Sequence, residues 1–158
     1  MNEALRVQYW LDEYAKDHQH PLNQRLHKIC VPLIVLSLVG LLWAIPVPAA
    51  FAEISPALNW ATAFLLAALV YYFILSIPLA LGMAPLVLLT VLIVDRLALL
   101  PWPVWATSAV IFVLAWVGQF YGHAVEGRKP AFFRDLQFLM IGPLWVLAAA
   151  YRRLGIPY

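Results

Sequence analysis

The sequence is poor in charged residues and in cysteine. Charged residues make up 11% of the 158 residues and hydrophobic residues 65%, whereas soluble proteins carry roughly 25% charged residues. A chain of this length is one domain, residues 1–158, and it is too small to bury so much apolar surface in water. The lipid bilayer is therefore its expected solvent. The one cysteine, Cys30, cannot form a disulfide within the chain.

Several catalytic motifs are also missing. The sequence has no Gly-x-Ser-x-Gly elbow for a nucleophilic serine and no glycine-rich loop for a phosphate. Its net charge of +2, without a basic block, argues against a nucleic-acid partner. Four histidines are too few for the histidine boxes of membrane di-iron desaturases. The apolar runs contain almost no glutamate, which excludes a ferritin-like di-iron site. A mononuclear metal site is what these residues can supply.

Long apolar runs dominate the rest of the chain. Four of them are long enough, or nearly so, to cross a bilayer. They cover residues 29–45, 57–81, 83–100 and 104–121. We therefore predict an all-α integral membrane protein with about four transmembrane helices.

The positions of lysine and arginine predict the orientation of these spans. Basic residues gather in segments 1–28 and 122–135, whereas the loops after the first and third runs contain none. Cytoplasmic loops carry an excess of lysine and arginine. Four spans place both basic segments in the cytoplasm. The expected location is a bacterial inner membrane, or the endoplasmic reticulum if the source is eukaryotic.

A fifth, shorter apolar run covers residues 136–151 and contains Gly142-Pro143. If this run crossed the membrane, Arg152 and Arg153 would lie outside, against the charge rule. We therefore predict a re-entrant or interfacial hairpin bent at Gly142-Pro143. Both termini are then cytoplasmic.

The segment before the first run predicts an amphipathic helix over residues 4–18. Apolar side chains and one histidine recur there at helical spacing, which places them on one face. They are Val7, Leu11, Tyr14 and His18. We expect this helix to lie on the membrane surface with His18 on its buried face and to end before Pro21.

All four histidines fall at one membrane interface in this topology. His18, His20 and His27 lie at the start of the first span, and His123 lies at the end of the fourth. Random placement would rarely put all four on one side. Polar groups at membrane depth are costly, so a cluster of them indicates function. We predict that the two places meet and bind a metal ion.

A second set of polar residues lies on and just after the last turn of the fourth span. Gln119, His123 and Glu126 share one helix face, with the imidazole and the carboxylate three residues apart. Asn23 stands four residues before His27 and could support a ligand or the substrate. Imidazoles suit Zn, Fe, Ni or Cu, and two histidines with one carboxylate and open positions favour Fe(II) oxygen chemistry.

Two patterns in this sequence resemble the signatures of a known family. The first is Tyr14…His18-x-x-Pro21-x-Asn23-x-x-x-His27, followed by Val31-Pro32. The second is Gln119-Phe120-x-Gly122-His123 with Glu126 and Pro130-Ala131 after it. In this order they resemble the 2-hydroxy fatty acid dioxygenase family, which includes the fungal endoplasmic-reticulum enzyme of phytosphingosine breakdown and many bacterial members. The resemblance covers nearly the whole chain.

This resemblance implies an Fe(2+)-dependent dioxygenase that uses dioxygen to shorten long-chain 2-hydroxy fatty acids by one carbon, a form of α-oxidation. The metal-ligand roles carry over to His18, His27, His123 and Glu126. His20 departs from the family pattern and ranks last among the histidines as a ligand.

Other residues then take supporting roles beside the metal. Tyr14, Asn23 and Gln119 would hold the ligands or the substrate. Arg128 or Lys129 could bind the substrate carboxylate, although a basic pair in a cytoplasmic loop also serves simply to orient the protein.

Two other classes stay open on the sequence alone. His27 and His123, on facing spans, could ligate a b-type haem in an electron-transfer subunit. The chain could also be a small structural or transport protein of the membrane without a metal.

Overall fold

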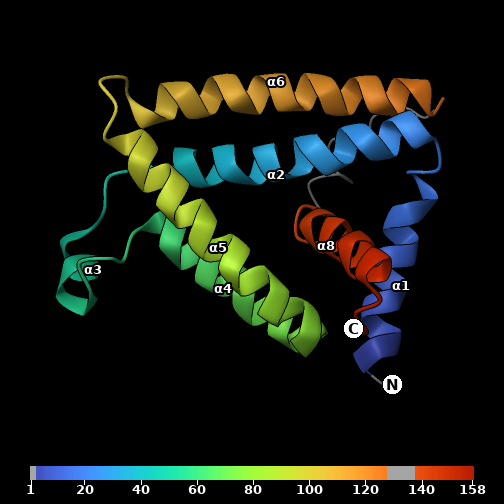
Figure 1. Cartoon of the computed structure of the whole chain (residues 1–158). Helices are drawn as coiled ribbons and strands as arrows, with labels where there is room; N and C mark the ends of the chain where they lie inside the picture. Colours follow the sequence, from blue (N-terminus) through green and yellow to red (C-terminus); the bar gives the residue numbers. More distant parts are fainter. Residues whose placement is uncertain (1–2, 128–137) are drawn as a thin grey trace.

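The computed structural model describes residues 3–127 and 138–158 (Figure 1). This part of the chain is helical, which confirms the all-α prediction. The helices are α1 (Glu3–Lys16), α2 (Pro21–Trp43), α3 (Ala49–Ile54), α4 (Trp60–Leu75), α5 (Ile77–Ala98), α6 (Val104–Val125) and α8 (Ile141–Leu154). Three of them, α2, α5 and α6, are long and apolar enough to cross a membrane, and α4 is apolar but only 16 residues long.

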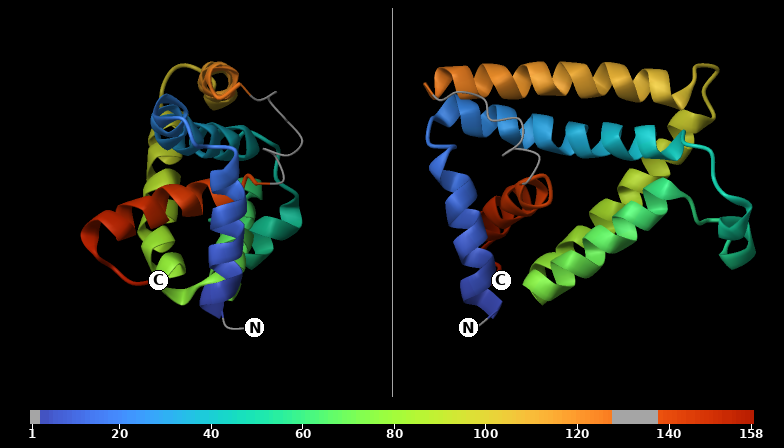
Figure 2. Two further views of the ribbon diagram at one scale, coloured as in Figure 1. Left: turned by 90° about the vertical axis from the view of Figure 1, so that its right-hand side faces the viewer. Right: turned by 180° about the vertical axis from the view of Figure 1, so that it is seen from behind.

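Helices α2 and α6 lie side by side and antiparallel (Figures 1 and 2). Small residues allow this close approach, as they do between many membrane helices. Each contact pairs a glycine with a short side chain of the other helix: Gly40 with Ser108, Gly118 with Cys30 and Gly122 with Asn23. A Cβ atom on Gly118 would lie only 2.6 Å from Cys30 Sγ. This pairing brings the beginning of α2 against the end of α6.

The second apolar run is broken at Ser76 and does not form the single span that we predicted over residues 57–81. Helix α4 ends at Leu75, and the Ser76 hydroxyl accepts a hydrogen bond from the backbone N–H of Leu79 (3.4 Å). A serine cap followed by proline in the first turn is a typical helix start. Helix α5 therefore begins at Ile77, and α4 and α5 form an antiparallel pair (Figure 1).

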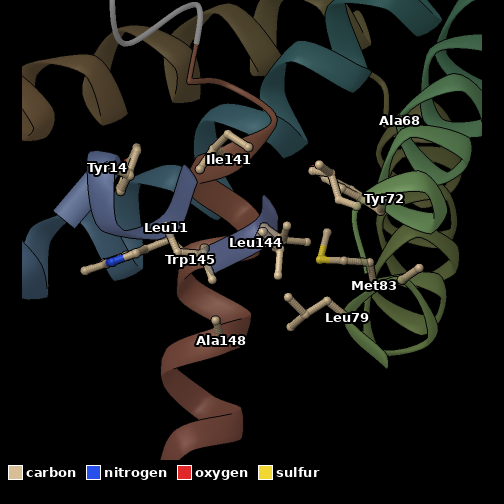
Figure 3. Close-up of a cluster of buried hydrophobic side chains, with 13 residues drawn as sticks. Leu11, Tyr14, Ala68, Tyr72, Leu79, Met83, Ile141, Leu144, Trp145 and Ala148 are labelled. Atoms are coloured by element: carbon tan, nitrogen blue, oxygen red, sulfur yellow. The ribbon is translucent and has the colours of Figure 1, made fainter. Parts of the chain in front are cut away.

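Helix α1 has the amphipathic stripe that the sequence predicted. Val7, Leu11 and Tyr14 are 1%, 2% and 6% exposed. They belong to one apolar cluster with side chains of α8, α4 and α5, among them Leu144 and Leu79 (Figure 3), and α1 packs directly on α8 and α4. Each such burial contributes about 2 kcal/mol. The apolar face of α1 is thus covered by the protein, so the surface-bound helix that we expected is a packed element of the bundle.

Gly142 and Pro143 lie in the first turn of α8, which continues as one helix to Leu154. The predicted hairpin bend at Gly142-Pro143 is therefore wrong. Proline fits the first turn of a helix because its missing N–H would have no partner there. Gly142 lets α8 approach α1 and α2 closely, since a Cβ atom on Gly142 would lie 3.2 Å from both Tyr14 Oη and a methyl group of Val31.

Candidate metal centre

Three histidines meet where α1, α2 and α6 come together. His18 lies in the turn after α1, His27 in the second turn of α2 and His123 in the last turn of α6. They are 2%, 1% and 3% exposed. The ring centroid of His27 is 4.1 Å from that of His18 and 4.9 Å from that of His123, and the third separation is 5.3 Å. The structure thus brings together residues from both ends of the chain.

The spacing of the three imidazoles suits one metal ion. One nitrogen from each ring lies within 4.8 Å of the others. Bonds from imidazole nitrogen to metal are about 2.1 Å long, so two ligands of one ion lie at most about 4.2 Å apart. The three rings must therefore move slightly closer together when an ion binds.

Backbone hydrogen bonds fix which nitrogen of His18 and of His27 can bind the ion. His18 Nδ1 lies 2.6 Å from the carbonyl oxygen of Tyr14, and His27 Nδ1 lies 3.0 Å from that of Asn23. A carbonyl oxygen only accepts, so each Nδ1 carries the proton and donates it. Each Nε2 then presents its lone pair, the arrangement that metal-binding histidines use.

His18 Nε2 is buried and has no hydrogen-bond partner anywhere in residues 3–127 and 138–158. A buried nitrogen without a partner costs about 1–3 kcal/mol. The pKa of His18 is lowered from 6.5 to about 4, chiefly by burial and in part by the nearby His123, although the hydrogen bond to Tyr14 acts in the opposite direction. The ring is therefore neutral at pH 7, and a neutral imidazole is the form that binds metals. These residues fit a metal ion.

Glu126 lies beside this group with its carboxylate bound to the start of α2. It accepts hydrogen bonds from the backbone N–H groups of Gln19 (2.8 Å) and His20 (2.8 Å) and from Asn23 Nδ2 (2.9 Å). Burial alone would raise the pKa of Glu126, but these hydrogen bonds outweigh it and lower the pKa. The positive end of α2 also favours an anion here. The three-histidine group does not include this carboxylate.

His20 is exposed and caps α2. Its Nδ1 accepts a hydrogen bond from the backbone N–H of Leu22 (3.2 Å). It is not part of the group of potential metal ligands in the portion of the chain that the structure describes. Arg128 and Lys129, which we predicted to bind the substrate carboxylate, lie outside the described residues.

Aromatic rings surround the histidines. Tyr14 stacks on His18, with centroids 4.2 Å apart and planes 9° from parallel. Trp145 of α8 lies 5.8 Å from His18 and is buried. Our reading of the sequence missed Trp145, because no spacing links the fifth apolar run to the histidines.

A small cavity of about 20 Å³ adjoins His27. Tyr14, Trp116, Gln119 and Gly142 are among the residues that line it. It has room for about one water molecule. Gln119 Oε1 is buried and has no hydrogen-bond partner among the described residues. The cavity therefore offers an unused acceptor beside a candidate ligand.

Substitution of Glu126 separates a structural role from a ligand role. We expect Glu126→Ala to lower metal affinity about 10–100-fold, because the segment that carries His18 loses its attachment to α6. Glutamine keeps one oxygen that can accept from the N–H groups of Gln19 and His20, so Glu126→Gln should cost less than about tenfold. Elemental analysis after dialysis against graded metal concentrations measures both. Equal loss in the two variants would instead identify the carboxylate as a ligand.

Comparison with known proteins adds one finding to this geometry. The sequence model of the family described as "2-hydroxy-palmitic acid dioxygenase Mpo1-like" matches residues 5–154. None of the curated proteins and none of the solved structures matches the chain at a significant level. The family is named for a dioxygenase of a 2-hydroxy fatty acid, which is the activity that membership indicates. The match spans nearly the whole chain, and the protein belongs to the Mpo1-like family.

Proposed function

We propose that this protein is an Fe(II)-dependent dioxygenase that shortens long-chain 2-hydroxy fatty acids by one carbon at the cytoplasmic face of a membrane. The observation that carries the proposal is the buried group of His18, His27 and His123. The family supplies the substrate class. Imidazole ligands suit both zinc and iron, but zinc has no redox chemistry, so a dioxygenase favours iron.

The residues of the chain hold the ion and shape the space beside it. When bound, iron supplies the redox chemistry for the reaction with dioxygen. The hydrogen bonds from His18 and His27 to backbone carbonyls fix the orientation of their rings. Tyr14 and Trp145 cover His18 and exclude water from that side. Gln119 Oε1 offers an unused hydrogen-bond acceptor in the small cavity beside His27.

The distribution of charge supports the cytoplasmic orientation. Arg152 and Arg153, at the end of α8, lie close enough to Lys28 for their charges to interact with it, and Arg25 does so as well. Basic residues from both ends of the described chain therefore share one side of the molecule, near the histidines. That arrangement agrees with the positive-inside rule.

Turnover of a defined substrate tests the proposed function. The full-length protein, purified in detergent and loaded with Fe(II), is incubated with 2-hydroxypalmitate in air. We expect pentadecanoic acid to be detected by mass spectrometry, and we expect no product from palmitate, which lacks the hydroxyl group. A chelator should stop the reaction, and Fe(II) but not Zn(II) should restore it. Absence of the odd-chain acid, or full activity with the chelator present, contradicts the proposal.

The geometry favours a single ion over a haem. The rings of His27 and His123 are 4.9 Å apart, and the adjoining cavity of about 20 Å³ is far smaller than a porphyrin. Insertion of a haem would require α2 to separate from α6, against the close contact of Gly118 with Cys30. We expect no Soret band in the optical spectrum and about one iron per chain by elemental analysis. The first result excludes the haem protein, and the second excludes a protein without metal.

A further inference from the structure

A large cavity of about 470 Å³ lies between α2, α4, α5 and α8. Its walls are almost wholly apolar. The hydroxyl groups that line it are already used, because Tyr72 donates to the carbonyl oxygen of Met140 (2.9 Å) and Thr90 to that of Leu86 (2.8 Å). Its volume falls within the range of ligand-binding pockets. The cavity therefore suits a hydrocarbon chain.

Helices α2 and α8 each carry a basic residue on the same face as the residues that line this cavity, at one end of that face. On α2, Pro32 and Val35 line the cavity and follow Lys28 by one and two helical turns. On α8, Val146 and Ala150 line it and precede Arg153 by two turns and one turn. An apolar slot with positive charge at one end is complementary to an anionic amphiphile.

The cations at this end have no acidic partner among the residues whose side chains the structure describes, 7–127 and 138–158. Arg153, Arg152 and Arg25 act electrostatically on Lys28, which is half-buried with its Nζ 5.7 Å from the centre of the Trp145 ring. None of the four forms an ion pair with an acidic residue in the described ranges 7–127 and 138–158. Four like charges without a counter-charge favour binding of an anion.

The large cavity is separated from the small one at His27 by a single layer of chain. In three pairs of consecutive residues, the first residue lines the small cavity and the second lines the large one. These pairs are Val31 and Pro32, Leu139 and Met140, and Gly142 and Pro143. A ligand in the large cavity therefore lies next to the candidate metal centre.

We propose that the large cavity and the cations at its end bind a long-chain carboxylate, with the chain between α2, α4, α5 and α8 and the carboxylate at Lys28 and Arg153. The volume of about 470 Å³ lies within the range of pockets that hold one drug-sized ligand, which suits a single acyl chain, whereas a phospholipid brings two chains. The site holds the acid beside the metal centre, and only the identity of the acid rests on the proposed function.

Photo-labelling tests this site without turnover. The probe is palmitic acid with a diazirine at mid-chain, added to the full-length protein in detergent after removal of metal with a chelator. We expect labelled peptides from α5 and α8, and we expect palmitate and 2-hydroxypalmitate to compete while hexadecanol and phosphatidylcholine do not. Lys28→Gln with Arg153→Gln should weaken competition by palmitate about tenfold, the effect of losing two partly screened ion pairs. Arg153→Lys should retain competition by palmitate.

A matched pair of tryptophan variants on α5 tests the position of the chain. Val87 lines the cavity, whereas Leu88 is 60% exposed and does not. Val87→Trp should abolish labelling, and Leu88→Trp should leave it unchanged. Competition by phosphatidylcholine equal to that by palmitate would reassign the cavity to bilayer lipid. Labelling that appears only with bound metal, and is absent from the metal-free protein and from His27→Ala, would place the acid at the metal centre instead. Failure of turnover alone leaves the labelling result unaffected, so the two proposals fail separately.

Discussion

Replacement of His27 by alanine is expected to remove both bound iron and turnover of 2-hydroxypalmitate. His27 is 1% exposed, and its Nδ1 is held by the carbonyl oxygen of Asn23, which leaves Nε2 to bind the metal. Loss of a residue that merely supports a metal ligand costs about 10–100-fold, and loss of a ligand should cost at least about 100-fold in affinity. The measurements are the ratio of iron to protein and the rate of formation of pentadecanoic acid.

His20→Ala is the matched control for this experiment. His20 lies in the same short segment but is exposed, and it caps α2 through the N–H of Leu22. Loss of a cap costs about 1 kcal/mol of stability. Iron content and turnover should therefore stay near the wild-type level. If His20→Ala loses iron as completely as His27→Ala, His20 is a ligand and the three-histidine centre is incomplete.

Gly122→Val should disrupt the centre without changing a candidate ligand. Any Cβ atom on Gly122 collides with Asn23 Oδ1. Asn23 cannot turn away freely, because its Nδ2 donates to Glu126 (2.9 Å) and to the carbonyl oxygen of Asp17 (3.2 Å). The end of α6 must then move away from α2, and His123 moves with it. We expect about 1–3 kcal/mol of destabilisation from overpacking and a loss of iron affinity of about 10–100-fold.

Ala124→Val separates this effect from helix propensity. Ala124 is exposed on the same turn of α6, and both substitutions place valine in the helix. Thermal unfolding and iron titration of the two variants in one detergent give the comparison. If both variants bind iron equally well, the contact between Gly122 and Asn23 does not position His123.

The features predicted correctly from the sequence depend on periodicity along the chain. The stripe of Val7, Leu11 and Tyr14 follows from helical spacing, and its burial is confirmed. Helix ends within apolar sequence were harder to predict. Ser76 interrupts a run of uniform composition, and only its combination with Pro78 marks the start of a new helix.

The features that could not be predicted depend on contacts between residues far apart in the sequence. The spacing of His123 and Glu126 predicted that they share a helix face, but it could not show which donors lie opposite. These donors are the backbone N–H groups of Gln19 and His20, just before α2, and both donate hydrogen bonds to the carboxylate of Glu126. Trp145 reaches His18 only because Gly142 lets α8 pack closely against α1 and α2. No local pattern encodes such a contact.

The placement of the three histidines also orders events during synthesis. His18 and His27 leave the ribosome about a hundred residues before His123. At about 5–20 residues per second, the nascent chain carries an incomplete pair of imidazoles for roughly 5–20 s. The third cannot join them until α6 has been made and has packed against α2. In the proposed function, iron loading is therefore a late step of synthesis, because a complete centre requires that α6 has already packed against α2.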